Sequence, residues 1–257
     1  MITHFSLPVA WAKILAETAL FLANFTIQRD FIFKTNRFVA AATDWDQYYT
    51  KVPFTAKLTR KYTLRTLVTA IQRFCGEEQR IVEIGGANSC FLDGILQKLR
   101  PLTYHVIDNN QYGLDLLNQR LSSNSKISAS RMDVLDVKRG VAPDADLVFS
   151  VGLIEHFDPI GTSKAIAAHF ELLPPGGCAI ISFPTPTWLY RIARATCEAL
   201  GLWKFPDERP LLRSEVLDSV TRCGDVLFEK TLWPLVFTQR LIVARKRPAK
   251  SEAKKAC

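Results

Sequence analysis

Short apolar segments alternate with amphipathic segments along most of the chain from about residue 63. An apolar run of a few residues suits a strand buried on both faces, whereas apolar positions at steps of three and four suit a helix. The pattern predicts helices over 63–75, 91–99, 113–121, 163–173, 188–200 and 214–223, and strands over 80–84, 103–107, 127–132, 145–151, 178–183, 226–232 and 239–244. This alternation favours an α/β fold, a parallel sheet with helices on both faces.

The end of the chain departs from this alternation. The last two predicted strands follow one another with no helix between them. We therefore expect a seven-stranded, mostly parallel sheet that ends in an antiparallel hairpin. Dinucleotide-binding doubly wound folds instead repeat strand and helix to the end.

An acidic residue and two glycines stand where the first predicted strand meets the next helix. Glu83 lies in the strand, and Gly85 and Gly86 follow it. Glycine permits a tight turn and a close approach of a ligand to the main chain, beside the open N–H groups of a helix start. This predicts a nucleotide-like ligand. A nicotinamide site would need glycine at the positions of Ala87 and Cys90.

Polar residues also follow the ends of later strands. Asp108 ends the second strand, Asp133 follows the third and Ser150 lies near the end of the fourth. The carboxyl ends of parallel strands form one rim of an open α/β sheet, where ligands bind. A carboxylate such as Asp108 can accept hydrogen bonds from two ribose hydroxyls, and its place after the glycine turn favours that role over an ordinary surface position.

These motifs make the chain resemble the class I S-adenosylmethionine (SAM)-dependent methyltransferases, in particular their small-molecule group, over about residues 63–245. The resemblance rests on EIGGANS at 83–89, VIDNN at 106–110, RMDVLD at 131–136, DLVFSVGLIEHFDP at 146–159 and LLPPGGCAIIS at 172–182. It implies a Rossmann-like fold and SAM as cofactor. The family turn has glycine where this chain has Ala87 and Ser89, the smallest substitutes.

The resemblance implies a set of residues for each part of SAM. They are Glu83, Gly85 and Gly86 for the methionine part, Asp108 for the ribose, Asp133 and Val134 for the adenine, and Ser150 and Val151 near the sulfonium. Asn88, in the same turn as the glycines, is also a candidate cofactor contact. No metal ligand is implied.

The acceptor side is predicted from the chemistry. Methyl transfer is an in-line displacement, so the chain must align the reactants and exclude water. His156 is the candidate base for a hydroxyl acceptor, with a structural or cofactor-lining role as the alternative. Tyr49 and Arg60 are candidate contacts to the methionine carboxylate or the acceptor, with packing as the alternative. Glu155 is a candidate contact to the acceptor, with anchoring of the loop before Pro159 as the alternative. The other histidines, which look like ordinary surface or helix residues, are His4, His105 and His169.

The acceptor class follows from absent motifs. The fourth strand leads into SVGLIEHF, without the Asp/Asn-Pro-Pro-aromatic loop of nucleic-acid amino methyltransferases, and no Pro-Cys nucleophile occurs there. This argues against nucleic acid and for a small-molecule, sugar or lipid-like acceptor, methylated on oxygen or nitrogen. Two alternatives stay open: a non-catalytic methyltransferase-like binding subunit, and an RNA-directed methyltransferase that uses a basic tail.

Composition changes this picture little. The chain has 257 residues, of which 48% are hydrophobic, enough for a packed core. Much of its formal charge of +8 falls in the last residues, which predicts a disordered basic tail over 248–257. Six cysteines without a C-x-x-C pair indicate neither a disulfide framework nor a metal site, which favours a cytoplasmic location.

Two segments outside the core are apolar. Residues 5–27 carry only Lys13 and Glu17 as charges, which favours a helix packed on the domain over contact with a membrane surface, and either over a span. An insertion at 184–210 holds an amphipathic helix, either packed at the domain edge or serving as a lid or lipid-facing surface. The predicted divisions are a helical cap at 1–62, the methyltransferase domain at 63–247 and the tail, with peripheral membrane contact through 5–27 or 186–203.

Overall fold

The computed structural model divides the chain into two compact units, Met1–Ala41 and Ala42–Cys257. It describes residues 11, 13, 14, 16–18, 20, 21, 42–50, 54–76, 79–121, 125–138, 140, 142–232 and 238–248. Most of the predicted cap before residue 42, most of the 5–27 segment and all but the first residue of the predicted tail lie outside these residues.

The described residues of the first unit are helical. Trp11, Ile14, Leu20 and Phe21 are all more than half exposed. Within the described part of the chain, no helix combines the length and apolar character needed to cross a membrane. Contact of this segment with a membrane surface stays a prediction.

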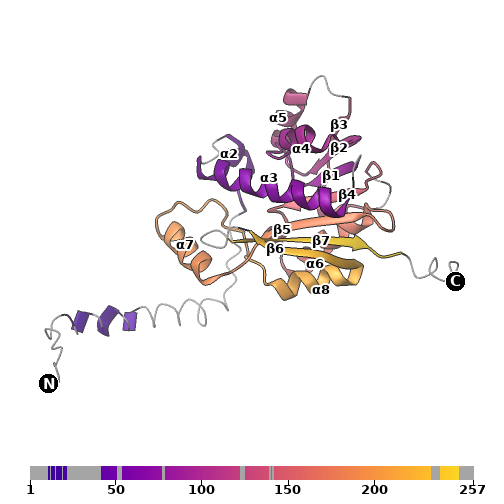
Figure 1. The fold of residues 1–257 in the computed structure, drawn as a ribbon. Coiled ribbons are helices and arrows are strands. Elements are labelled where there is room, and N and C mark those ends of the chain that lie inside the picture. The colour runs from indigo at the N-terminus through magenta and orange to yellow at the C-terminus, as the bar shows by residue number, and fades with distance from the viewer. Residues whose placement is uncertain are drawn as a thin grey trace. The chain divides into compact units, whose positions relative to one another are not determined.

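A seven-stranded sheet forms the centre of the second unit (Figure 1). Its strands are β1 (Arg80–Ile84), β2 (Thr103–Asp108), β3 (Ile127–Arg131), β4 (Leu147–Val151), β5 (Cys178–Pro184), β6 (Gly224–Leu232) and β7 (Gln239–Lys246). Their order is β3-β2-β1-β4-β5-β7-β6; β1 to β5 are parallel, and β7 runs antiparallel to both its neighbours. The predicted fold class and the closing hairpin are confirmed.

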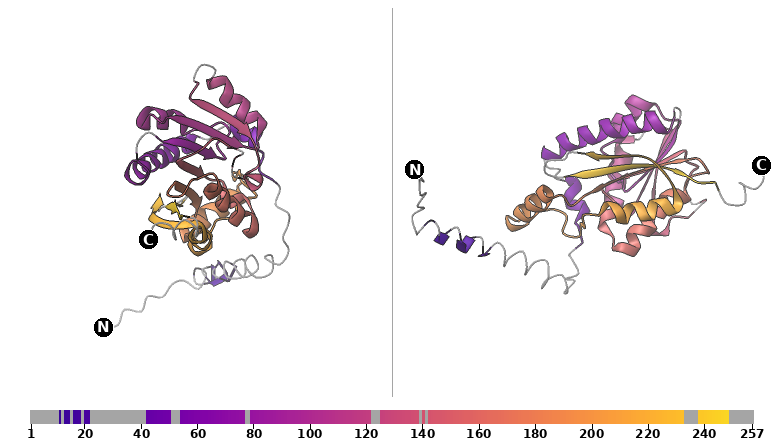
Figure 2. Two further views of the ribbon diagram at one scale, coloured as in Figure 1. Left: turned by 90° about the vertical axis from the view of Figure 1, so that its right-hand side faces the viewer. Right: turned by 60° about the horizontal axis from the view of Figure 1, so that its bottom comes forward.

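Helices cover both faces of the sheet (Figures 1 and 2). They are α2 (Trp45–Thr50), α3 (Phe54–Phe74), α4 (Leu92–Leu99), α5 (Gln111–Leu121), α6 (Pro159–Glu171), α7 (Trp188–Ala199) and α8 (Arg213–Cys223). One core cluster joins the sheet to α3, α4 and α5, and a second joins it to α6 and α8. Such two-sided burial explains why apolar residues fill the middle of β1 and most of β4 and β5.

Helix α3 begins at Phe54, earlier than its predicted start at residue 63, and it runs through the predicted division between residues 62 and 63. The added residues include Ala56, Lys57 and Leu58, all good helix formers, although their apolar spacing is irregular. Helix α3 belongs to the same compact unit as the sheet.

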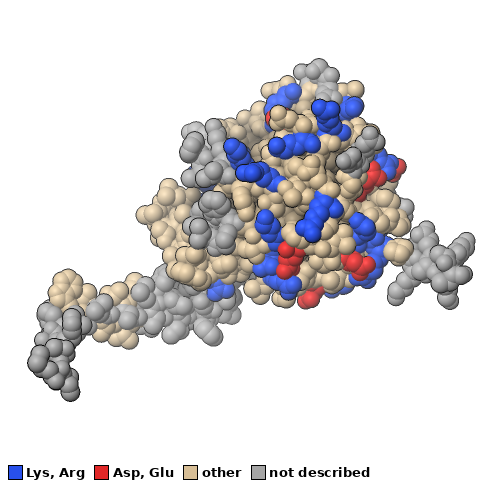
Figure 3. Space-filling view, viewed as in Figure 1, with Lys and Arg blue, Asp and Glu red and all other residues tan. Residues whose placement is uncertain are grey.

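Helix α7 lies in the insertion between β5 and α8. Its Tyr190 is buried, but Trp188 and Ile192 are 70% and 57% exposed, and Leu200 and Leu202 after it are similarly exposed. The described surface over α7 is free of charged side chains on the face seen in Figure 3. An apolar face therefore remains uncovered within this unit.

Two histidines differ from the surface or helix positions expected for them. His105 lies in a strand, β2, where its ring nitrogens are 2.7 and 2.8 Å from the hydroxyls of Ser128 and Ser130 on β3. His169 is helical but fully buried, bonded to the carbonyl of Ala165 and, at 2.8 Å, to the hydroxyl of Ser150. Burial lowers the pKa of His169 to about 4, so this ring is neutral at neutral pH.

Candidate functional site

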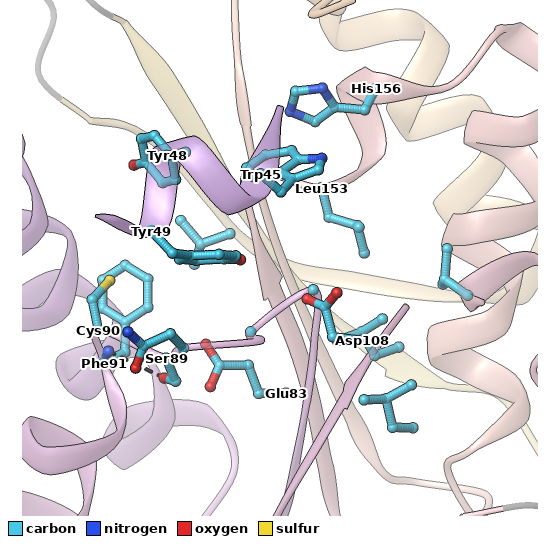
Figure 4. Close-up of a pocket in the computed structure, with 18 of the residues that line it drawn as sticks. Trp45, Tyr48, Tyr49, Glu83, Ser89, Cys90, Phe91, Asp108, Leu153 and His156 are labelled. Carbon is cyan, nitrogen blue, oxygen red and sulfur yellow. Dashed lines mark hydrogen bonds between the residues drawn. The ribbon is translucent and has the colours of Figure 1, made fainter. Parts of the chain in front are cut away.

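A cavity of about 650 Å³ opens at the carboxyl ends of β1, β2 and β4. Its volume lies within the range of about 300 to 1,000 Å³ typical of small-molecule sites. In the view of Figure 4, Glu83 and Asp108 lie on one side of Tyr49, and Trp45 lies between Tyr49 and His156. The cavity is thus bounded by the rim of the sheet and by α2.

The two glycines after β1 are required by the backbone and by close packing. Gly85 has a φ of +77°, which side-chain-bearing residues rarely adopt, and a Cβ there would lie 2.9 Å from Leu153. A Cβ on Gly86 would lie only 2.4 Å from the carboxyl carbon of Glu83. The turn can therefore approach a ligand closely only with glycine at both positions.

Ser89 caps the helix that follows the turn. Its Oγ accepts hydrogen bonds from the N–H groups of Phe91 and Leu92, at 3.2 and 3.1 Å. These two donors at the start of α4 are therefore already satisfied, and the expectation that they face a ligand was wrong. The serine that departs from the family's glycine instead stabilises the end of the turn.

Glu83 is almost fully buried beneath the turn. The Tyr104 hydroxyl donates a hydrogen bond of 2.6 Å to its carboxyl group. Burial raises the pKa of Glu83 to about 7, the charge of Asp108 adds to this rise, and hydrogen bonds from Ser89 and Tyr104 oppose it. Glu83 is therefore partly protonated near neutral pH.

Asp108 is held in place by the main chain. Its two carboxylate oxygens accept hydrogen bonds from the N–H groups of Ala87 and Asn110, at 2.9 and 2.8 Å. Burial raises the pKa of Asp108, and these backbone bonds oppose the rise. Each oxygen keeps a second lone pair for a ligand hydroxyl.

Asp133 lies at the next strand end and caps the short helix Val134–Asp136 by accepting from the N–H group of Leu135 at 2.8 Å. Val134 beside it is buried in the cavity wall.

Ser150 is a correction to the predicted site. It does not line the cavity, because its fully buried hydroxyl faces α6 and bonds to His169. The neighbouring Val151 lines the cavity instead, since successive residues of a strand point to opposite faces. The other residues predicted to contact cofactor or acceptor all line it: Tyr49, Arg60, Glu83, Gly85, Gly86, Asn88, Asp108, Asp133, Val134, Val151, Glu155 and His156.

The far end of the cavity holds a histidine–carboxylate pair. His156 Nδ1 lies 3.0 Å from Oδ1 of Asp207, which also accepts from the main chain and hydroxyl of Thr43. Burial acts to raise the pKa of Asp207, but the hydrogen bonds from His156 and Thr43 prevail and lower it to about 2. Asp207 is therefore ionised, which fixes the proton of His156 on Nδ1 and leaves Nε2 as an acceptor.

The pKa of His156 responds to opposing influences. Burial lowers it, but the bond to Asp207 and the nearby charge of Glu155 outweigh burial, so that the pKa is raised above 6.5. Glu155 itself is 3% exposed, and burial raises its pKa to about 8. Tyr49 faces the opposite end, where burial and the charges of Asp108 and Glu83 raise its pKa.

Comparison with solved structures identifies the architecture. N-methyltransferase NodS from Bradyrhizobium japonicum WM9, in complex with S-adenosyl-L-homocysteine (SAH), is 19% identical, with a TM-score of 0.54 over 72% of this chain and 87% of its own. Magnesium protoporphyrin IX methyltransferase from Synechocystis PCC 6803, with bound SAH, is 13% identical, with a TM-score of 0.60 over 76% and 89%. An O-methyltransferase family protein from Burkholderia thailandensis is 15% identical, with a TM-score of 0.60 over 77% and 59%.

The chain has the class I methyltransferase fold. No protein-family model and no curated protein sequence matches it. At these identities the likeness concerns the methyltransferase fold alone.

Residues missed from the sequence also line the cavity, among them Arg120, Phe205, Asp207 and Glu208. Arg120, in the last turn of α5, donates to Asn88 and Asp93, at 2.7 and 2.8 Å. Asp207 and Glu208 come from the segment after α7, which carries no recognisable motif. A cluster of two acidic residues and an aromatic one, Phe205, was the available signal.

Proposed function

We propose that this chain is a SAM-dependent methyltransferase that acts on a small-molecule acceptor. One observation carries the proposal: a single cavity joins the Gly85–Gly86 turn and Asp108 at one end to the His156–Asp207 pair at the other. A donor and an acceptor of the methyl group can thus be held in the same enclosed space.

The residues of the rim fit the parts of SAM. Gly86 lines the cavity without a side chain, so a ligand can approach its main chain, and Glu83 beneath it offers a carboxyl group for the methionine amine. The lone pairs that Asp108 retains suit the ribose hydroxyls, while Asp133 and Val134 suit the adenine. When bound, SAM supplies a methyl group activated by a sulfonium.

The chain's own residues would receive the acceptor and its proton. With Nδ1 of His156 donating to Asp207, Nε2 is the basic atom, and the carboxylate holds the ring in position. Trp45 packs edge-on against the His156 ring, with 5.1 Å between the ring centroids, and helps to exclude water. Glu155 and Arg60 are the proposed acceptor contacts.

The two alternative functions predict different experimental results. A non-catalytic binding subunit would show no transfer of a labelled methyl group from SAM to any compound of a cell extract. An RNA-directed enzyme would lose RNA affinity steeply with salt, and lose it altogether on deletion of residues 248–257.

The cofactor part of the proposal is tested by Asp108→Ala. Loss of one or two hydrogen bonds to a charged acceptor predicts SAM binding weaker by about 2 to 4 kcal/mol, measured by isothermal titration. Asp115→Ala, which removes an exposed carboxylate from α5, is the control and should bind as the unaltered chain does. No measurable SAM binding to the unaltered, folded chain would refute the proposed function, and equal affinities of the two variants would place the ribose elsewhere.

A further inference from the structure

The end of the cavity around His156 combines carboxyl groups with aromatic rings. Glu155, Asp207 and Glu208 line it, together with the rings of Trp45 and Phe205. These residues come from α2, from the turn after β4 and from the segment after α7, so the fold brings together side chains that are distant in the sequence. Such a composition is unusual for a site that receives a neutral, apolar molecule.

Glu155 has an unmet hydrogen-bonding need. Its side chain is 3% exposed and lines the cavity, and its Oε2 atom has no hydrogen-bond partner among the residues that the structure describes. A buried carboxyl oxygen without a partner is costly, and a donor on a ligand in the cavity would satisfy it.

The other two carboxyl groups add one negative charge, on Asp207, and further hydrogen-bond acceptors to the region. Asp207 is ionised and shares its charge with His156. Glu208 lies behind it and accepts a hydrogen bond from the Tyr190 hydroxyl. Arg194 reaches the main-chain carbonyl of Glu208, at 2.8 Å, and pairs through its Nε with Glu198 outside the cavity.

The aromatic rings form the walls of the same region. The ring centroids of Trp45 and Phe205 are 5.9 Å apart, and that of Tyr48 lies 5.2 Å from Phe205 and 5.8 Å from Trp45. The guanidinium of Arg60 already lies over the Tyr48 ring, 5.7 Å from its centre. Aromatic faces beside carboxylates are the usual surroundings of a bound organic cation.

We propose, on the basis of the function proposed above, that the acceptor is an amine that enters this end of the cavity as an ammonium ion. Its N–H groups donate to Glu155 and its charge lies against the rings of Trp45 and Phe205. A hydroxyl acceptor would bring no charge to the rings, and a carboxylate acceptor would place a second negative group beside Asp207 and no donor beside Glu155.

The proton balance of such a reaction uses residues of the chain. The ammonium ion gives one proton to Nε2 of His156, and the nitrogen lone pair forms the bond to the methyl carbon as the carbon–sulfur bond breaks and sulfur keeps the electron pair. The methylated amine leaves as an ammonium ion, and the proton on His156 passes to solvent.

The test uses three probes of equal chain length: butylammonium, butan-1-ol and butyrate. Isothermal titration first measures SAH binding, and the probes are then titrated into the SAH-saturated chain at neutral pH. We expect butylammonium to bind about tenfold more tightly than butan-1-ol, and butyrate to bind more weakly than either. Equal affinities for butylammonium and butan-1-ol, or a higher affinity for butyrate than for butylammonium, would overturn the proposal about the acceptor. The proposed function would still stand in that case, provided that SAH binds.

If SAH does not bind, the proposed function fails, and the same titrations on the unliganded chain still decide whether this region prefers a cation. Glu155→Gln should reduce butylammonium affinity about tenfold and leave butan-1-ol affinity unchanged. Glu171→Gln, on the exposed side of α6, is the matched control and should change neither. Phe205→Leu keeps all charges but removes the ring, and it should weaken the binding of butylammonium about threefold. If neither Glu155→Gln nor Phe205→Leu changes the affinity for butylammonium, the proposed position of the ammonium group is refuted.

Discussion

Neighbouring acidic residues of the cavity have opposite protonation behaviour because their partners differ. Asp207 accepts from His156 and Thr43, and its pKa falls to about 2 although burial acts in the other direction. Glu155 has no such donors, so burial dominates and raises its pKa to about 8. Titratable groups whose pKa values are separated in this way are typical of sites that move protons.

Asp207→Asn should lower the pKa of His156. The substitution removes the charge and the hydrogen bond that outweigh burial, so the imidazolium loses its main stabilising partner. The chain has four histidines, and NMR titration of their ring protons, with His156→Gln for assignment, measures the shift directly. Asp218→Asn on the exposed side of α8 should leave the pKa unchanged. A His156 pKa equal in the two variants would show that Asp207 does not control this ring.

At the scale of elements, buried strands were the most predictable part of the molecule. The strand β1 was predicted with its observed limits, because its apolar residues Ile81, Val82 and Ile84 form the short run typical of a strand buried on both faces. The rim residues Glu83, Asp108 and Asp133 could also be predicted, because each stands at or near the end of a predicted strand.

The segment after α7 could not be predicted in this way. The main-chain N–H groups of Arg209 and Leu211 donate to the carbonyls of Glu155 and Pro184, at 2.9 Å each, and these bonds between distant parts of the chain set its path. No local pattern of apolar positions encodes such contacts, so Asp207 and Glu208 could not be placed beside His156 from the sequence. Ser150 failed for a related reason: its strand was correct, but the face it occupies depends on strand register.

Helix α7 lies in one of the two segments, 5–27 and 186–203, for which contact with a membrane surface is predicted. Burying Trp188 and Ile192 in a lipid surface would contribute roughly 1.5 to 3 kcal/mol each. We expect Trp188→Ser with Ile192→Ser to reduce co-sedimentation with vesicles of phosphatidylcholine and phosphatidylserine at least tenfold. Leu102→Ser, which removes an exposed leucine before β2, is the control. Absence of vesicle binding by the unaltered chain would contradict this prediction.

At the scale of the whole molecule, His169 links folding to pH. Its pKa is about 4 in the folded chain and about 6.5 when exposed, so between these values the unfolded chain binds a proton that the folded chain does not. The stabilisation is complete above pH 6.5 and is lost as the pH falls. We expect a loss of roughly 2 kcal/mol between pH 6.5 and 5.

Urea unfolding of the unaltered chain and of His169→Gln at both pH values measures this loss. Glu83 and Glu155 have raised pKa values and contribute in the opposite direction, losing stability as the pH rises, but they do so in both proteins and cancel in the comparison. Equal pH dependence of the two proteins would exclude His169 as the cause.

Helix α2 touches both ends of the cavity although none of its residues is buried. Asp46 accepts from Asn110, beside Asp108, at 2.7 Å, and Thr43 just before the helix is bonded to Asp207. So short a helix owes its position to these two attachments, to the packing of Trp45 and Tyr48 against Phe205, and to a ligand that fills the cavity beneath it. A molecule bound at either end therefore lowers the entropic cost of ordering α2 for the other, and the two ligands should bind cooperatively even though they need not touch.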